Sequence, residues 1–163
     1  MRKVQPRPGQ ESAWDYPRPP RLERTGRRIR IEHRNETLAD TTRAWRVLET
    51  SHPPVYYVPS KDVRMDLLTR NPSGTSFCEW KGAAVYYDVV AGADLVSRGA
   101  FSYEDPTSAF EPIAGHVAFY AGRLDRCTVD GETVRPQPGS FYAGWITDDV
   151  VGPFKGEPGT QGW

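Results

Sequence analysis

Proline and glycine divide this chain into short segments, and their spacing limits what it can fold into. The 163 residues include 15 prolines and 15 glycines. Proline fixes φ and lacks an amide donor, and glycine allows positive φ, so both residues favour turns between short elements. This pattern is typical of many short strands joined by tight turns, and it predicts a mainly β fold.

Alternating and β-branched segments lie between these turns. Residues 28–32, Arg-Ile-Arg-Ile-Glu, alternate polar and apolar side chains as a half-buried strand does. Further strands are predicted at 38–42, 45–48, 55–58, 76–90, 95–103, 113–120, 124–129 and 133–134. Residues 60–68 favour one short helix. Ser60 can cap this helix, and Val63 and Leu67 fall four positions apart on one face.

The two ends of the chain differ in composition from its centre. Residues 1–34 hold ten basic and four acidic side chains, a net charge of +6, although the whole chain is neutral. Five prolines before residue 21 predict an extended arm, which Trp14 and Tyr16 are expected to anchor against the body or a second subunit. The predicted units are an N-terminal arm at 1–26, a β-rich core at 27–135 and a Gly/Pro/aromatic extension at 136–163 packed on the core. Because both ends can wrap a neighbouring copy, we expect a homodimer.

Composition argues against several classes of protein. No stretch approaches the roughly 20 apolar residues of a membrane span, and no signal-peptide segment follows Met1. Two cysteines are too few for a disulfide framework, so we expect a reduced, cytoplasmic setting. With 21 basic and 21 acidic residues, the chain has no strong field for an anionic membrane or nucleic acid. A nucleic-acid interface on the basic arm is therefore the less favoured alternative.

Motifs of several enzyme classes are missing from the sequence. It has neither the phosphate loop G-x-x-x-x-G-K-[ST] nor the G-x-S-x-G nucleophile turn. Nucleotidyl transfer needs carboxylates spaced to hold Mg²⁺, whereas the adjacent Asp148 and Asp149 would point to opposite faces of a strand. The two cysteines and three histidines lack the spacing of a zinc site. We predict no metal site and no cofactor.

Residues 75–82 combine a thiol, a carboxylate, an indole and an amine. A thiolate nucleophile needs a nearby cation, so Cys78 and Lys81 are candidates for a catalytic pair. This requires an irregularity at Gly82 that turns Lys81 towards Cys78, because a regular strand would place the two on opposite faces. The alternative is that Cys78 is a small buried hydrophobe.

Aromatic residues on neighbouring strands suggest a pocket. Tyr57, Trp80 and Tyr103 could bind a planar or cationic small molecule by stacking, or they could form an ordinary aromatic core. Lys81 and Glu49 are candidate polar anchors of this pocket.

Arg64 is the third candidate anchor. Its guanidinium could bind a ligand carboxylate or phosphate, or form a structural salt bridge with Glu49 or Asp66. His52 and His116 are single histidines near proline or glycine, and we expect both to be structural or exposed rather than general bases.

Several motifs, taken in order, resemble one family. They include His-Pro-Pro at 52–54, Tyr-Tyr-Val-Pro at 56–59, Cys-Glu-Trp-Lys-Gly-Ala at 78–83, Ser-Tyr-Glu-Asp-Pro at 102–106 and Ile-Ala-Gly-His-Val-Ala-Phe-Tyr at 113–120. This chain resembles the bacterial and fungal family called domain of unknown function 427. The ends at 14–20 and 144–156 are similar to those of its longer actinobacterial members.

The resemblance implies a fold, the β-tent, in which two antiparallel sheets meet at an angle. Methionine sulfoxide reductase B, with a catalytic cysteine, and the thalidomide-binding domain of cereblon, with a tryptophan cage, belong to the same fold group. Cys78 and Trp80 invite comparison with both. The zinc-binding C-x-x-C pairs of some relatives are missing here, and Glu79 stands where the family usually has proline.

The residues leave three functions open. The first is the binding of an unknown small molecule in an aromatic pocket between two β-sheets. The second is a thiol-dependent, redox-type enzyme that uses Cys78. The third is a protein or nucleic-acid interaction module that uses the arm, so the sequence does not decide whether the protein is an enzyme.

Overall fold

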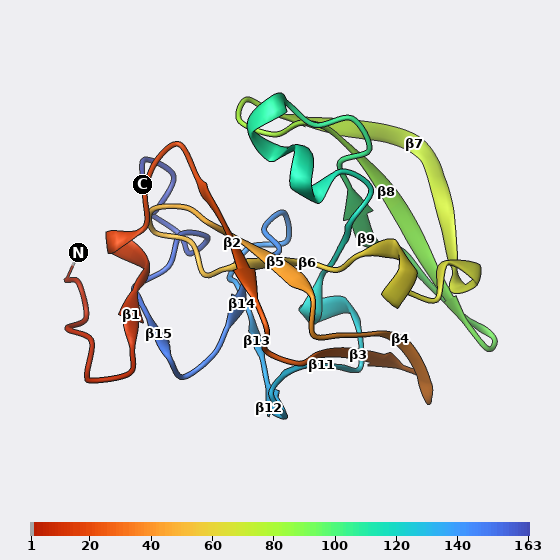
Figure 1. Cartoon of the computed structure of the whole chain (residues 1–163), viewed down its shortest axis with the longest axis horizontal. Helices are drawn as coiled ribbons and strands as arrows, with labels where there is room; N and C mark the ends of the chain where they lie inside the picture. Colours follow the sequence, from red (N-terminus) through yellow and green to blue (C-terminus); the bar gives the residue numbers. More distant parts are fainter. Residues whose placement is uncertain (1) are drawn as a thin grey trace.

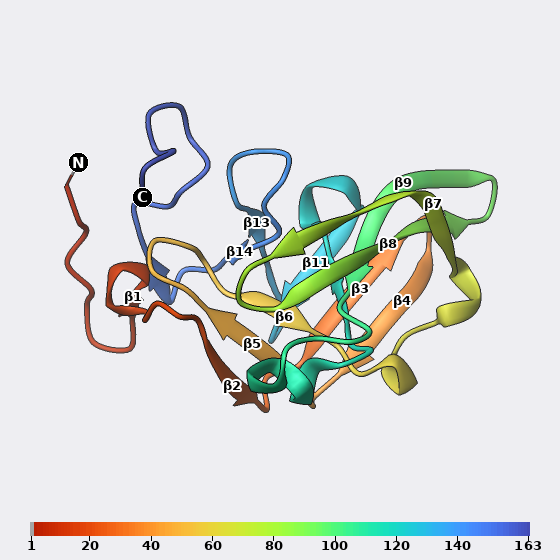
Figure 2. The ribbon, with the colours of Figure 1, turned by 90° about the horizontal axis from the view of Figure 1, so that it is seen from above.

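The computed structural model describes residues 2–163 and consists mainly of antiparallel β-sheets, none of which closes into a barrel (Figures 1 and 2). One four-stranded sheet has the order β10-β9-β8-β7 and contains β7 (Leu68–Cys78), β8 (Gly82–Ala91), β9 (Asp94–Ser102) and β10 (Val117–Phe119). The other has the order β12-β11-β3-β4 and contains β3 (Ile29–His33), β4 (Glu36–Thr41), β11 (Arg126–Val129) and β12 (Glu132–Thr133). The predicted β fold is confirmed.

Three smaller sheets complete the fold. A three-stranded sheet contains β2 (Arg21–Thr25), β5 (Ala44–Leu48) and β6 (Val55–Tyr57), with β5 in the middle. Two strand pairs are formed by β1 (Glu11–Ser12) with β15 (Val150–Val151) and by β13 (Arg135–Pro136) with β14 (Trp145–Ile146). Short 3-10 helices connect the strands: η1 (Ala13–Asp15), η2 (Ser60–Asp62), η3 (Met65–Leu67), η4 (Ser108–Ile113) and η5 (Ala121–Arg123).

The sheet of β7 to β10 has a hydrophobic core on each face. Successive side chains of a strand point to opposite faces, so Ala100 and Phe119 pack in one core while Phe101 and Tyr120 pack in the other. The first core fills the space towards β3, β4 and β11, and Figure 1 shows the two four-stranded sheets inclined to each other around it. The second core lies towards β5 and β6, and it borders the cavity described below.

The predicted helix at 60–68 is wrong. The segment contains two single turns, η2 and η3, separated by Val63 and Arg64 in a more extended conformation. Val63 forms a β-bridge with Ala39, and the Arg64 N–H donates to Leu38 O at 2.7 Å. These bonds to β4 replace the i to i−4 bonds that a continuous helix would need, so the tertiary pairing outweighs the local helical pattern.

The predicted strand at 76–90 is in fact a hairpin. β7 ends at Cys78, a turn covers Glu79–Lys81, and β8 begins at Gly82. Paired residues of the hairpin, such as Ser76 with Ala84 and Cys78 with Gly82, are separated by even numbers of positions. They therefore share a face just as they would along a single strand, and the period of two cannot distinguish the two structures.

The two ends of the chain pack against each other. β1 pairs in parallel with β15, and the Trp14 indole N–H donates to Pro153 O at 2.9 Å. The Trp14 ring also meets the Trp163 ring edge to face, with centroids 5.2 Å apart. Tyr16 is buried beside these contacts. The predicted unit boundaries at residues 26 and 135 stay a prediction.

Between residues 2 and 163, no helix is long and apolar enough to cross a membrane.

Candidate functional site

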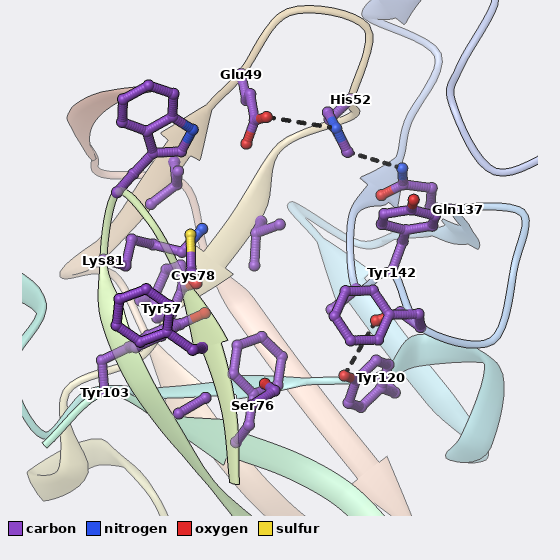
Figure 3. A pocket seen from close by; sticks show the side chains of 18 of the residues that line it. Glu49, His52, Tyr57, Ser76, Cys78, Lys81, Tyr103, Tyr120, Gln137 and Tyr142 are labelled. Carbon is purple, nitrogen blue, oxygen red and sulfur yellow. Dashed lines mark hydrogen bonds and ion pairs between the residues drawn. The ribbon is translucent and has the colours of Figure 1, made fainter. Parts of the chain in front are cut away.

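A cavity of about 280 Å³ lies beside the second core, between the β7–β8 hairpin, the β5–β6 strands and the C-terminal extension (Figure 3). The hairpin and the strands β5, β6 and β9 supply Val47, Val55, Tyr57, Ser76, Phe77, Cys78, Ala84, Tyr86 and Phe101. Loops and the extension supply Glu49, His52, Pro53, Glu79, Trp80, Lys81, Tyr103, Tyr120, Gln137, Phe141, Tyr142, Ala143 and Lys155. The lining thus combines an aromatic wall with four residues that carry acidic or basic side chains: Glu49, Glu79, Lys81 and Lys155.

The aromatic wall consists of side chains that hold one another in place. Phe101 lies at its centre, 6.1 Å from the Tyr57 ring, 6.1 Å from the Tyr103 ring and 5.4 Å from the Tyr120 ring. Burial raises the pKa values of the Tyr57 and Tyr103 hydroxyls above their ordinary value, so both stay protonated at neutral pH. The wall therefore offers flat apolar surfaces together with neutral hydroxyl groups.

The hairpin turn positions three of the candidate residues, Cys78, Trp80 and Lys81. Its backbone is fixed by Thr107, whose hydroxyl donates to Trp80 O at 2.6 Å and whose N–H donates to Lys81 O at 3.1 Å. Gly82 follows the turn with φ +105°, a conformation that other residues rarely adopt. Lys81 and Cys78 consequently line the same cavity instead of opposite faces, and the Lys81 ammonium lies 5.5 Å above the Tyr103 ring (Figure 3).

A chain of polar side chains links the extension to Glu49 (Figure 3). The Gln137 carbonyl oxygen accepts from the Gly144 N–H at 3.1 Å, which fixes the orientation of its amide group. The Gln137 amide nitrogen then donates to Lys155 O at 2.9 Å and contacts His52 Nδ1 at 3.0 Å. Because Nδ1 of His52 is an acceptor here, its proton resides on Nε2, which lies 3.6 Å from Glu49 Oε2.

Glu49 keeps its capacity to accept hydrogen bonds. Its Oε2 atom lies 3.6 Å from both Arg18 Nε and His52 Nε2, and its carboxylate accepts no hydrogen bond within residues 2–163. Burial lowers the pKa of His52, and the charges of Lys155, Arg18 and Lys81 lower it further against the opposing effect of Glu49. At neutral pH, His52 is therefore mainly neutral.

Six of the seven candidate residues line this cavity: Glu49, Tyr57, Cys78, Trp80, Lys81 and Tyr103. Arg64 lies elsewhere. Its guanidinium is half-exposed and forms a two-point contact with Asp66, at 2.9 and 2.8 Å, which is the structural salt bridge of the two alternatives.

The sequence did not predict that the C-terminal extension and His52 line the cavity. His52 was expected to be structural or exposed. Gln137, Tyr142 and Lys155 enter the cavity from more than 50 residues beyond the hairpin turn. The aromatic residues of the extension were the available signal, but nothing in the sequence indicates which surface they cover. Among the described side chains, no group of three or more His, Cys, Asp or Glu residues could hold a metal ion.

Comparison with known families identifies one match. The model described as Domain of unknown function (DUF427) matches residues 21–130, about two thirds of the chain. This range includes the aromatic wall residues Tyr57 to Tyr120 and the hairpin turn, whereas Gln137, Tyr142 and Lys155 lie beyond it. No curated protein matches the sequence.

Proposed function

The chain belongs to the DUF427 family, and from that premise we propose that it binds a small planar molecule in the cavity beside the β7–β8 turn. The observation that carries this proposal is an aromatic-walled cavity that is also lined by a carboxylate, Glu49, which accepts no hydrogen bond from residues 2–163. Stacking surfaces combined with a few polar groups are typical of small-molecule sites.

The charged groups favour a binding site over an ordinary aromatic core. A packed core excludes charged side chains, whereas a small-molecule site combines apolar surfaces with a few of them. Here Lys81, Lys155 and Glu49 all border the cavity. A volume of about 280 Å³ lies just below the usual range of about 300–1,000 Å³ for drug-sized ligands, which suits a small molecule of one or two rings.

A thermal-shift screen against metabolites and nucleotides tests the proposal. A ligand at about a hundred times its Kd stabilises a protein by about 2.7 kcal/mol, which raises the Tm of such a domain by several degrees. This gain should disappear in Trp80→Ala, and it should persist in the matched control Trp163→Ala, because Trp163 lies outside the cavity. An equal gain in Trp80→Ala, or no stabilising compound, would contradict the proposal.

A thiol-dependent reaction is the second candidate function, favoured by the presence of Cys78 and Lys81 in one cavity. Cys78 is partly exposed, so it can reach a molecule bound there. Rapid alkylation of Cys78 by iodoacetamide near neutral pH, slowed by any ligand found in the screen, is the expected result. An inert Cys78 in the folded protein would exclude this candidate.

A further inference from the structure

Two lysine side chains reach the cavity from different parts of the chain. Lys81 comes from the hairpin turn, and its ammonium lies 5.5 Å above the Tyr103 ring. Lys155 comes from the C-terminal extension, and its ammonium lies 6.0 Å above the Tyr142 ring. Within residues 2–163, no carboxylate lies within ion-pair distance of either ammonium group.

The backbone around Lys155 is held against the body. Its N–H donates to Ser51 O at 2.9 Å, and its carbonyl accepts from the Gln137 side chain at 2.9 Å. Because the turn carrying Lys81 is fixed by Thr107 as well, both lysines extend from well-defined backbone positions. Fixed attachment points lower the entropic cost of using these side chains to bind a ligand.

The charges around the cavity favour an anion. Arg18 lies close to Glu49 and opposes its charge, so the ammonium groups of Lys81 and Lys155 remain uncompensated among the residues that line the cavity. Glu79 also borders the cavity, but its side chain is exposed to solvent, where its charge is screened. An aromatic cage for a cationic ligand would normally exclude two lysines, because like charges oppose such binding.

We propose that the cavity binds an aromatic acid, a molecule of one or two rings with one carboxylate or phosphate group. The rings lie against the aromatic wall, and the acidic group is bound by the ammonium groups of Lys81 and Lys155. Glu49 accepts a hydrogen bond from an N–H or O–H donor on the same molecule. This inference rests on the proposed function, because it specifies the ligand of the same cavity.

Calorimetric titration with a matched set of probes tests the charge of the ligand. The set consists of 2-naphthoate, 2-naphthyl phosphate, neutral 2-naphthamide and cationic 2-naphthylmethylamine, which share one ring system. We expect one of the two acids to bind about a hundredfold more tightly than the amide, because each of two charge-assisted contacts contributes about tenfold. Whichever acid binds more tightly identifies the acidic group.

Substitution of the two lysines then tests whether they cause the preference for an acidic ligand. Lys81→Gln and Lys155→Gln should each reduce the preference for the acid over the amide by about tenfold, whereas the exposed Lys61→Gln, away from the cavity, should not change it. Thermal unfolding of each variant establishes that it is folded. Raising the salt concentration should weaken binding of the acid and leave that of the amide unchanged.

The failures of the two proposals are distinguishable. Equal binding of acid and amide, or tighter binding of the amine, would overturn the aromatic-acid inference and leave small-molecule binding in place. Failure of all four probes would also overturn it. The thermal-shift screen then tests the proposed function by itself. An uncharged compound that stabilises the wild type but not Trp80→Ala would still support the cavity as a binding site.

Discussion

Gly156 is the position at which a single methyl group should displace the C-terminal extension. Its φ is +129°, and a Cβ built there would lie 1.8 Å from the Pro138 carbonyl oxygen. An ordinary contact needs more than 3 Å, so either Pro138 or the segment carrying Gly156 must move by more than about 1 Å. We expect the segment carrying Gly156 to move, since β15 is the last strand of the described chain and none follows it.

The bonds that hold this segment set the magnitude of the effect. Moving it breaks the contacts of the Lys155 N–H with Ser51 O and of the Lys155 carbonyl with Gln137, and it disturbs the 2.9 Å bond from the Gly156 N–H to Thr160 Oγ1. At about 1 kcal/mol for each hydrogen bond and about 1 kcal/mol for the strain of a non-glycine residue at positive φ, Gly156→Ala should lower the free energy of unfolding by about 4 kcal/mol.

Gly159→Ala is the matched control for this prediction. Gly159 also has a positive φ, +87°, but a Cβ there would meet no atom within 4 Å. It should therefore cost only the backbone strain, about 1 kcal/mol. Urea unfolding at pH 7 measures both variants. Equal destabilisation by the two substitutions would refute the assigned clash, and an unchanged affinity of Gly156→Ala for 2-naphthoate would argue against the role of Lys155.

Three further outcomes are expected. The Arg46 guanidinium and the Tyr16 hydroxyl lower the pKa of Glu11 below 4.5, although burial opposes this. The stabilisation by ionised Glu11 is therefore complete above about pH 4.5 and is lost as the pH falls through the lowered pKa. Glu11→Gln should be less stable than the wild type in urea unfolding at pH 7, and a gap that stays constant down to pH 3 would contradict this. Burial raises the pKa of Cys127 to about 12, so iodoacetamide should leave it unmodified in the folded protein at pH 8, as peptide mapping would detect. The homodimer stays a prediction, although the two ends pack against each other within one chain: light scattering at micromolar concentration should give the mass of a dimer, and a monomer mass would reject it.

The alternation of polar and apolar residues predicts the fold best where only one structure fits it. The alternation at residues 28–32 corresponds to β3, whose Ile29 and Ile31 are fully buried in the first core. The same alternation predicts the fold less well where a single strand and a hairpin would both show it. The β7–β8 hairpin preserves the even spacing of a single strand, so the turn at residues 79–81 was not predicted.

The candidate site was predictable in part for a similar reason. Glu49, Tyr57 and Trp80 could be selected as residue types suited to binding, and the structure places them around one cavity. The partners of His52 and Lys81 could not be predicted, because contacts across about 85 residues, such as His52 with Gln137, have no local signal. Arg64 differs, because its guanidinium binds the carboxylate of Asp66, only two residues away, and this partner could be named from the sequence.

The division of the cavity between two parts of the chain has a consequence for how its ligand can change. The two sheets that carry Tyr57 and Phe101 lie within the matched range 21–130, whereas Gln137 and Lys155 belong to a segment outside it. Substitution of the partly exposed Lys155 can alter the charge that borders the cavity without disturbing the strand pairing that supports the rings. We therefore expect the proposed ligand preference to change at this position at little cost in stability, and we expect relatives with a different C-terminal segment to accept different acids or none.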